Sequence, residues 1–298
     1  MLPSPDPTAR PVMTRRTGLL AAISALLAGC SAVEALNALV PIGTYRGREA
    51  VPYGSGPCQQ LDLYLPLTPP ADRPPPVVVF FYGGNWNSGE RAAYRFVGEA
   101  LASAGAIVAI PDYRLYPEVR YPAFLDDGAA AVRWVLANAA QLGGDPARVV
   151  LMGHSAGAYN AAMLALDPRW LGPQRAQISG LIGIAGPYDF LPIQNPETQK
   201  AFNWPDTPRD SQVFGHVTPA APRTLLLAAR SDHLVDPQRN TVGLGQRLKA
   251  AGVPAAVQVL DGVSHGTVIG AMARPLRFLA PVRAEVLAFL GLRAGDAK

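Results

Sequence analysis

Residues 149–166 read VVLMGHSAGAYNAAMLAL, and this stretch decides the fold. An apolar run of strand length ends at Gly153, and an alanine-rich run of helical length starts directly after Ser155. Glycine stands two positions before and two positions after the serine, as a sharp strand–turn–helix connection requires. Such a turn lifts the Ser155 hydroxyl above the sheet, beside a helix N-terminus that favours negative charge. The pattern predicts Ser155 as a nucleophile, against the alternative of an idle serine in a glycine-flanked turn, and gives His154 a packing role.

Short apolar runs of strand length recur along the chain and alternate with helical patterns. This alternation predicts one α/β domain with a mostly parallel central sheet and helices on both faces. The expected strands are residues 61–65, 77–82, 106–110, 149–152, 181–185, 224–228 and 256–260, and the expected helices are 92–104, 124–140, 156–166, 238–251 and 276–290.

One long stretch, residues 187–222, has no regular pattern and is rich in proline, asparagine, aspartate and aromatic residues. Loops of this length are uncommon unless they are functional. We expect a short cap insertion that lies over the nucleophile and offers apolar side chains to a substrate. The predicted substrate-binding residues are Trp86, Phe190, Phe202 and Trp204, and the alternative is that the aromatic residues only hold a long loop on the sheet.

Residues 82–86, YGGNW, follow the most hydrophobic expected strand. Acyl transfer needs backbone N–H donors directed at the tetrahedral oxyanion, and paired glycines allow the backbone to turn these donors inward. Paired glycines also serve hairpin turns, but residues 87–91 read as a loop entering a helix rather than as a second strand. We therefore predict the N–H groups of Gly84, Asn85 and Ala156 as the oxyanion hole.

A serine hydroxyl is a weak nucleophile and needs a base, normally histidine, that a carboxylate orients. In a site of this kind the chain order is serine, acid, histidine. Of the four histidines, His154 adjoins the serine, His216 precedes the candidate acids and His233 would share the acid's own loop. His265 follows the last expected strand and is flanked by glycines, so it is the predicted base.

Three aspartates compete for the role of the acid. Asp232 comes just after the strand at 224–228, at the tip of a loop. Asp236 precedes Pro237, which is typical of a helix N-cap followed by proline at the first helical position. Asp189 follows an earlier strand and is the third choice. We predict Asp232 as the acid.

The region from about residue 61 to residue 290 resembles an α/β-hydrolase. It is most similar to the esterase branch that holds carboxylesterases of the hormone-sensitive-lipase type, arylformamidases and prenylcysteine methylesterases. This family usually has histidine where Tyr82 stands and glycine, alanine or tyrosine where Asn85 stands, so the substrate subclass stays open. The resemblance rests on residues 82–86, 112–115, 143–146 and 153–157, on Asp232 with Val235, and on His265 with Gly266.

The resemblance implies an esterase, and the residues themselves predict a serine hydrolase that cleaves carboxylic esters through an acyl-enzyme. A triad of this kind needs no metal and no organic cofactor, so we expect neither. An amide or formamide hydrolase, a peptidase or an acyltransferase would use the same residues. An alternative of another class is a non-catalytic binding lipoprotein on a hydrolase scaffold, because a fold does not guarantee an activity.

The N-terminus resembles an export signal. Arg15 and Arg16 precede the apolar run 18–28, which is too short to span a bilayer, and Gly29-Cys30 follows. We predict residues 1–29 as a lipoprotein signal peptide, 30–50 as a tether and entry segment, and 51–298 as the catalytic domain with the cap segment 187–222. Cys30 would be lipidated and would anchor the protein in a bacterial cell envelope, where it faces the periplasm. Because serine follows Cys30, we expect the outer membrane. The alternative is that this segment forms a buried amphipathic helix. The sequence fits export by either the twin-arginine or the general route. It also fits a start at either Met1 or Met13.

Charge and cysteine content exclude some partners and sites. The net charge is +4, and it falls to +2 without the first 29 residues, which hold three arginines and one aspartate. No basic run interleaved with aromatic residues occurs, so we expect no nucleic acid partner. Only Cys58 remains beyond Cys30, so the mature chain has no cysteine metal site, and this thiol is expected to be packed or idle. The sequence does not determine the oligomeric state.

Overall fold

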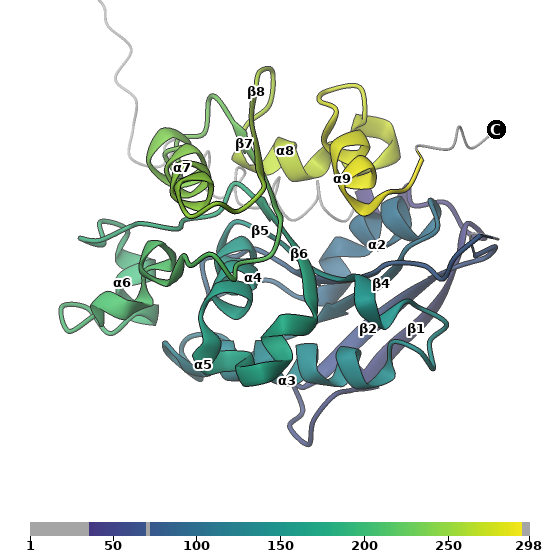
Figure 1. Ribbon diagram of the computed structural model, residues 1–298, viewed down its shortest axis with the longest axis horizontal. Coiled ribbons are helices and arrows are strands. Elements are labelled where there is room, and N and C mark those ends of the chain that lie inside the picture. Colours follow the sequence, from purple (N-terminus) through teal and green to yellow (C-terminus); the bar gives the residue numbers. More distant parts are fainter. Residues whose placement is uncertain (1–35, 70–71, 294–298) are drawn as a thin grey trace, which may run out of the picture.

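The computed structural model describes residues 36–69 and 72–293, which fold around an eight-stranded sheet (Figure 1). The strand order is β1-β2-β4-β3-β5-β6-β7-β8; β1 and β4 each pair antiparallel with β2, and all other pairs are parallel. The predicted mostly parallel sheet is therefore confirmed. The strands are β1 Tyr45–Pro52, β2 Gln60–Pro66, β3 Val77–Phe81, β4 Ile107–Pro111, β5 Val149–His154, β6 Ile178–Ile184, β7 Thr224–Ala229 and β8 Ala255–Leu260.

The central strands are buried on both faces. Every residue of β3, β4 and β5 is buried, which explains their continuous β-branched and aromatic sequences. Helices supply the cover: α3, α4 and α5 pack together on one face, while α2 packs against α9 on the other (Figure 1). The helices are α2 Arg95–Ala102, α3 Ala123–Asn138, α4 Ala156–Leu166, α5 Pro168–Leu171, α6 Pro196–Ala201, α7 Gly243–Ala250, α8 His265–Gly270 and α9 Val282–Leu290.

The helix after the candidate nucleophile, α4, is buried along its whole length. It lies against β5 and β6 on one side and against α3 and α5 on the other. Its alanine-rich sequence suits this position, because small side chains let a helix approach its neighbours closely on every side. The burial fixes the helix N-terminus, and with it Ser155, relative to the sheet.

The expected tether at residues 30–50 needs a correction. β1 begins at Tyr45 and pairs with β2, so a domain boundary at residue 51 would divide a strand. β1 escaped prediction because it is an edge strand whose sequence, YRGREAVP, is mostly exposed and has no apolar alternation. The predicted signal peptide at 1–29 and the lipidation site at Cys30 lie outside the described residues.

The irregular segment 187–222 connects β6 to β7 and contains one short α-helix, α6, with 3₁₀ turns at Arg209–Ser211 and Val213–His216. The side chain of Asn195 caps α6 by accepting from the N–H groups of Glu197 and Thr198, and Pro196 takes the first helical position. Within residues 36–69 and 72–293, no helix has the length and apolar character that crossing a membrane requires.

Candidate active site

Ser155 lies in the sharp turn between β5 and α4. Its backbone has φ +53° and ψ −124°, a strained conformation for a residue with a side chain. The flanking glycines are needed sterically: a Cβ on Gly153 would lie 2.2 Å from the Gly157 carbonyl oxygen, and one on Gly157 would lie 2.1 Å from that of Phe81. The turn therefore has the geometry of a nucleophile elbow, in which the surroundings hold the serine in an unfavourable conformation.

The structure brings Ser155, His265 and Asp232 together. His265 Nε2 lies 2.9 Å from Ser155 Oγ, and His265 Nδ1 lies 2.7 Å from Asp232 Oδ2. Because the carboxylate can only accept, Nδ1 carries the proton and Nε2 is free to accept the serine hydroxyl proton. The arrangement can activate the hydroxyl for attack on a carbonyl carbon.

Asp232 is held as a carboxylate. Burial alone would raise the pKa of Asp232, but the hydrogen bond from His265 and the N–H groups of Val235 and Leu234 outweigh it and lower the pKa. Both N–H groups donate to Asp232 Oδ1 at 2.9 Å. These bonds leave Oδ2 for the imidazole and fix its direction.

The competing aspartates have other partners. Asp236 accepts from the N–H groups of Gln238 at 2.8 Å and Arg239 at 3.1 Å, in the manner of the predicted N-cap. Asp189 forms an ion pair with Arg239 at 3.0 Å. Of the three candidate acids, Asp232 is therefore the one that bonds to His265.

His265 is the first residue of α8, and two contacts fix it there. Ser264 and Thr267 form a reciprocal capping box at the start of the helix. His154 Nε2 lies 3.0 Å from the backbone carbonyl oxygen of His265, to which it donates. Burial, and then the neighbouring His265, lower the pKa of His154 to about 3, so its imidazole is neutral at pH 7. His154 is buried, and beyond the expected packing it bonds to the segment that carries the base.

The loop after β3 lies directly against Ser155. A Cβ on Gly83 would be 2.9 Å from Ser155 Cβ, and the next three residues all have positive φ: +134° at Gly84, +54° at Asn85 and +60° at Trp86. Among residues 36–69 and 72–293, the N–H groups of Gly84 and Asn85 have no acceptor. These donors are thus available to a bound oxyanion.

The third predicted donor, the N–H of Ala156, opens α4, where no intrahelical acceptor exists. Asn85, Ser155, Ala156 and His265 line one cavity of about 430 Å³. The structure therefore places the predicted nucleophile, base and two of the three predicted oxyanion donors at a common surface.

The wall of this cavity differs in part from the prediction. Trp86 and Phe190 line it, as expected, but Phe202 and Trp204 do not. Phe202 is fully buried behind Trp86, with the two ring centroids 4.7 Å apart, and Trp204 is 44% exposed beyond the end of α6. The sequence could not separate these aromatics, because the face that each presents depends on where α6 begins and ends. The remaining lining residues, none of which was predicted to bind substrate, are Pro187, Asp189, Pro192, Ile193, Gln194, Asn195, Thr198, Leu234, Val235, Asp236, Arg239 and Asn240.

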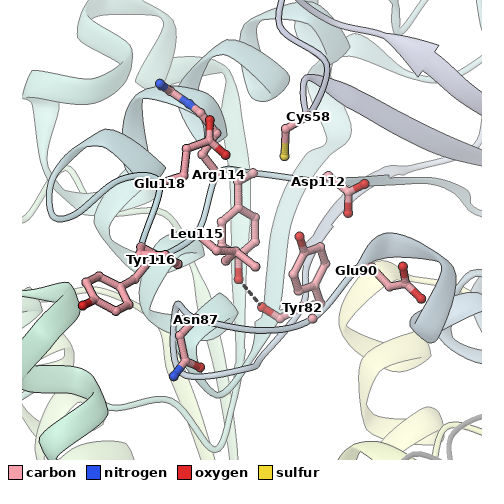
Figure 2. Close-up of a pocket in the computed structure, with 12 residues that line it drawn as sticks. Cys58, Tyr82, Asn87, Glu90, Asp112, Arg114, Leu115, Tyr116 and Glu118 are labelled. Carbon is pink, nitrogen blue, oxygen red and sulfur yellow. Dashed lines mark hydrogen bonds between the residues drawn. The ribbon is translucent and has the colours of Figure 1, made fainter.

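Tyr82, where the resembling family usually has histidine, lines a different cavity. This second cavity has a volume of about 560 Å³ and is also lined by Cys58 and Asp112 (Figure 2). The Tyr82 ring stacks on Tyr113 with centroids 4.6 Å apart, and the Tyr113 hydroxyl donates to the Tyr82 carbonyl at 2.7 Å. Tyr82 therefore packs against Tyr113 and is not among the residues that line the cavity at Ser155.

Cys58 has the environment of an unreactive thiol. Burial, and then the nearby carboxylate of Asp112, raise the pKa of Cys58 to about 11, so at pH 7 it carries a proton. Asp112 itself is paired with Arg91. In the part of the chain that the structure describes, no group of histidine, cysteine, aspartate and glutamate side chains is arranged to hold a metal ion.

The BD-FAE family matches residues 61–244, which is more than half of the chain. The chain belongs to the BD-FAE family. The match covers the loop at Gly84, the nucleophile elbow at Ser155 and Asp232, and it ends before His265. Membership in this family was not evident from the motifs, which indicated the wider esterase group.

Two curated relatives carry esterase names. This BD-FAE chain is 30% identical over 242 residues to isoprenylcysteine alpha-carbonyl methylesterase ICME of Arabidopsis thaliana, covering 73% of the chain and 56% of that protein. It is 49% identical over 98 residues to carboxylesterase NlhH of Mycobacterium tuberculosis (strain ATCC 25618 / H37Rv), covering 33% of the chain and 31% of that protein. The chain spans about half or less of the length of these relatives.

Among solved structures, esterase B of Lactobacillus rhamnosis superposes with a TM-score of 0.75 at 19% sequence identity, covering 94% of this chain and 96% of that one. At this identity the likeness bears on the fold alone. Together with the strand order, it confirms the predicted α/β-hydrolase fold.

Proposed function

We propose that this BD-FAE protein is a serine hydrolase that cleaves carboxylic esters through an acyl-enzyme. The observation that carries the proposal is the continuous chain of hydrogen bonds from Asp232 through His265 to Ser155, with 2.7 Å and 2.9 Å separations. Ser155 and His265 line the same cavity as Asn85 and Ala156, two of the three candidate oxyanion donors. The methylesterase and carboxylesterase names of the two relatives support an ester as the substrate.

In the first half of the reaction, Ser155 Oγ attacks the ester carbonyl carbon while its proton passes to His265 Nε2. Asp232 stabilises the imidazolium that forms, because its carboxylate is buried and already bonded to Nδ1. The carbonyl oxygen becomes an oxyanion, which accepts from the N–H groups of Gly84, Asn85 and Ala156. The tetrahedral intermediate then collapses as His265 returns the proton to the leaving alcohol.

In the second half, a water molecule takes the place of the alcohol. His265 removes a proton from the water, whose oxygen attacks the acyl carbon of the Ser155 ester. Collapse of this second intermediate releases the carboxylic acid and restores the serine hydroxyl. Each step uses the same base and the same N–H groups, so no further side chain is needed.

A substrate-panel experiment tests the proposal. The wild type should hydrolyse p-nitrophenyl esters, while Ser155→Ala should lose nearly all activity and unfold at an unchanged temperature. The matched control is Ser55→Ala, which removes the hydroxyl of an exposed serine. A p-nitroanilide with the same acyl group measures the amide alternative. A wild type that binds these esters without turning them over would instead support the non-catalytic alternative.

We also propose that the chain is anchored to a bacterial cell envelope by lipid on Cys30. The support is the sequence alone: an arginine pair, a short apolar run and small residues directly before the cysteine. Full-length protein expressed in a bacterial host with a lipid-reactive label should carry the label and sediment with membranes. Cys30→Ser should remove both properties, and an unlabelled wild type that stays in the soluble fraction would contradict the anchor.

A further inference from the structure

The side chains of the candidate oxyanion loop are bonded to α6. Thr198 Oγ1 donates to Asn85 Oδ1 at 2.6 Å, and Thr198 is buried. The Asn85 amide nitrogen lies 3.5 Å from Asn195 Oδ1, the oxygen that caps α6. The first turn of α6 therefore holds the side chain of a residue whose own N–H is a candidate oxyanion donor.

A second contact joins the same two elements. Asn87 Nδ2 donates to Glu197 Oε2 at 3.1 Å, and Glu197 in turn pairs with Lys200 at 2.7 Å. Asn85 and Asn87 thus reach adjacent residues of α6, Thr198 and Glu197. Two bonds from alternate loop residues to consecutive helix residues fix the orientation of the loop as well as its distance from α6.

The side chain of Trp86, which lies between the two asparagines in the sequence, is held by contacts with α4 and Phe202. Its indole Nε1 donates to Asn160 Oδ1 of α4 at 3.0 Å, and its ring packs edge-on against Phe202, the C-cap residue of α6. The Trp86 side chain is 1% exposed. The side chains of Asn85, Trp86 and Asn87 are therefore all held by other elements, and those of Asn85 and Asn87 are held by residues of α6.

The backbone of this loop needs such support. Gly84, Asn85 and Trp86 all have positive φ, which for residues other than glycine is an unfavourable conformation that persists only when the surroundings enforce it. Asparagine tolerates this region better than most residues. The Gly84 carbonyl, which belongs to the same peptide unit as the Asn85 N–H, accepts from the N–H groups of Asn87 at 3.1 Å and Ser88 at 3.0 Å and from the Ser88 hydroxyl at 3.0 Å. These bonds restrain one side of Asn85, and the bond from Thr198 to its side chain adds the restraint from α6.

We propose that α6 is a positioning element for the oxyanion hole, and that the Thr198 hydroxyl acts through Asn85 to fix the direction of the Asn85 N–H. The inference rests on the proposed ester hydrolysis and adds a role for the segment 187–222. Thr198 and Asn195 also line the cavity, so the segment that shapes the substrate site also sets the turnover rate.

The test compares Thr198→Val, which keeps the shape of the side chain and removes its hydroxyl, with the wild type on p-nitrophenyl acetate. Loss of a whole oxyanion donor lowers kcat about 10²–10³-fold, so a misdirected donor should lower kcat about tenfold, with KM within about twofold. The concentration of active sites is measured by titration with a fluorophosphonate, so that kcat is calculated from active protein alone. Thr198→Ser, which keeps the donor, should restore most of the rate.

The matched control is Thr224→Val. Thr224 is buried at the start of β7, at the opposite end of the parallel strands from Ser155, and its hydroxyl donates to the Pro222 carbonyl at 2.9 Å. It should leave kcat unchanged. A Thr198→Val kcat equal to that of the wild type, or equal losses in both threonine variants, would overturn the role of α6.

A second variant keeps the test decisive if Thr198→Val folds poorly. Asn85→Gly retains the positive φ and removes the side chain, so it should lower kcat by about as much, and adding Thr198→Val should change it little further. Independent, multiplying losses would contradict a common route through Asn85. A wild type that neither hydrolyses esters nor reacts with the fluorophosphonate would refute the proposed function itself, whereas an active wild type with an equally active Thr198→Val refutes only this inference.

Discussion

His154 is a buried neutral imidazole one residue before the nucleophile, and it gives the protein a specific pH dependence of stability. In the folded protein the pKa of His154 is lowered to about 3 from its ordinary value of 6.5. Below pH 6.5 the unfolded chain therefore binds a proton that the folded protein does not. Folding stability is fully present above pH 6.5 and falls as the pH drops toward 3, by up to about 1.4 kcal/mol per pH unit.

Urea unfolding between pH 7.5 and 4.5 measures this effect. His154→Gln should flatten the dependence of the unfolding free energy on pH, because glutamine does not titrate while its amide can still donate. His233→Gln, at a histidine exposed to water, is the control and should leave the slope near that of the wild type. Parallel slopes for wild type and His154→Gln would show that His154 titrates normally in the fold.

Asp232 and Asp236 provide a comparison between two neighbouring carboxylates. Asp232→Asn removes the charge that orients and stabilises the imidazole, and should lower kcat about 10⁴-fold. Asp236→Asn should cost far less, since asparagine is also a good N-cap and Asp236 bonds only to the start of its own helix. The measurement is kcat on one ester for both variants, and the reverse ranking would make Asp236 the orienting acid.

At the scale of residues, chain order and local pattern were enough to predict the three side chains that the structure brings together. Ser155 has its glycine-flanked turn, and His265 and Asp232 follow strands in the required order. Phe202 and Trp204 could not be placed, because each lies beyond a short helix whose ends depend on tertiary contacts. Thr198 had no signal at all, since its importance arises from a contact with a loop more than a hundred residues away.

At the scale of elements, a buried charge cluster joins α2 to the segment between α8 and α9. Glu99 of α2 is 1% exposed and bonds to Arg274 at 3.0 Å and to Arg277 at 3.4 Å. Burial, and then the neighbouring Arg283, lower the pKa of Arg277 to about 10. The buried carboxylate therefore compensates two part-exposed positive charges at once.

Removing that carboxylate should destabilise the protein. We expect Glu99→Gln to lower the unfolding free energy by about 3 kcal/mol, the lower end of the range for breaking a buried ion pair, because the arginines are part-exposed. Glu49→Gln, at an exposed residue 4.0 Å from Arg95, is the control and should change stability by less than about 1 kcal/mol. Equal effects in urea unfolding would mean that the cluster gives no stability beyond that of a surface pair.

The elements that the sequence predicted best are those with strong periodicity. The buried strands β3 and β5 and the helix α4 were found within a few residues of their observed ends, because burial on both faces dictates their composition. β1 was missed because an exposed edge strand is stabilised by its partner and needs no apolar pattern. α6 was missed because it is only six residues long and has no apolar periodicity, although Asn195-Pro196 is a helix-start signal.

At the scale of the whole molecule, the cavity is built from five separate stretches of chain around Asn85, Ser155, residues 187–198, residues 234–240 and His265. The sequence of any one of these stretches does not predict the shape of the cavity. The fold class followed from alternating strands and helices, but the cavity volume and its lining follow from how loops from different strand ends meet at one edge of the sheet.

In the proposed mechanism, Ser155 forms the covalent intermediate with help from His265 and Asp232. The most direct test is to treat the full chain with a fluorophosphonate, digest it and locate the adduct by mass spectrometry. We predict one adduct per chain, on Ser155, formed at a rate that falls sharply in His265→Ala. An adduct on any other residue, or labelling of Ser155 at the same rate with and without His265, would contradict the account.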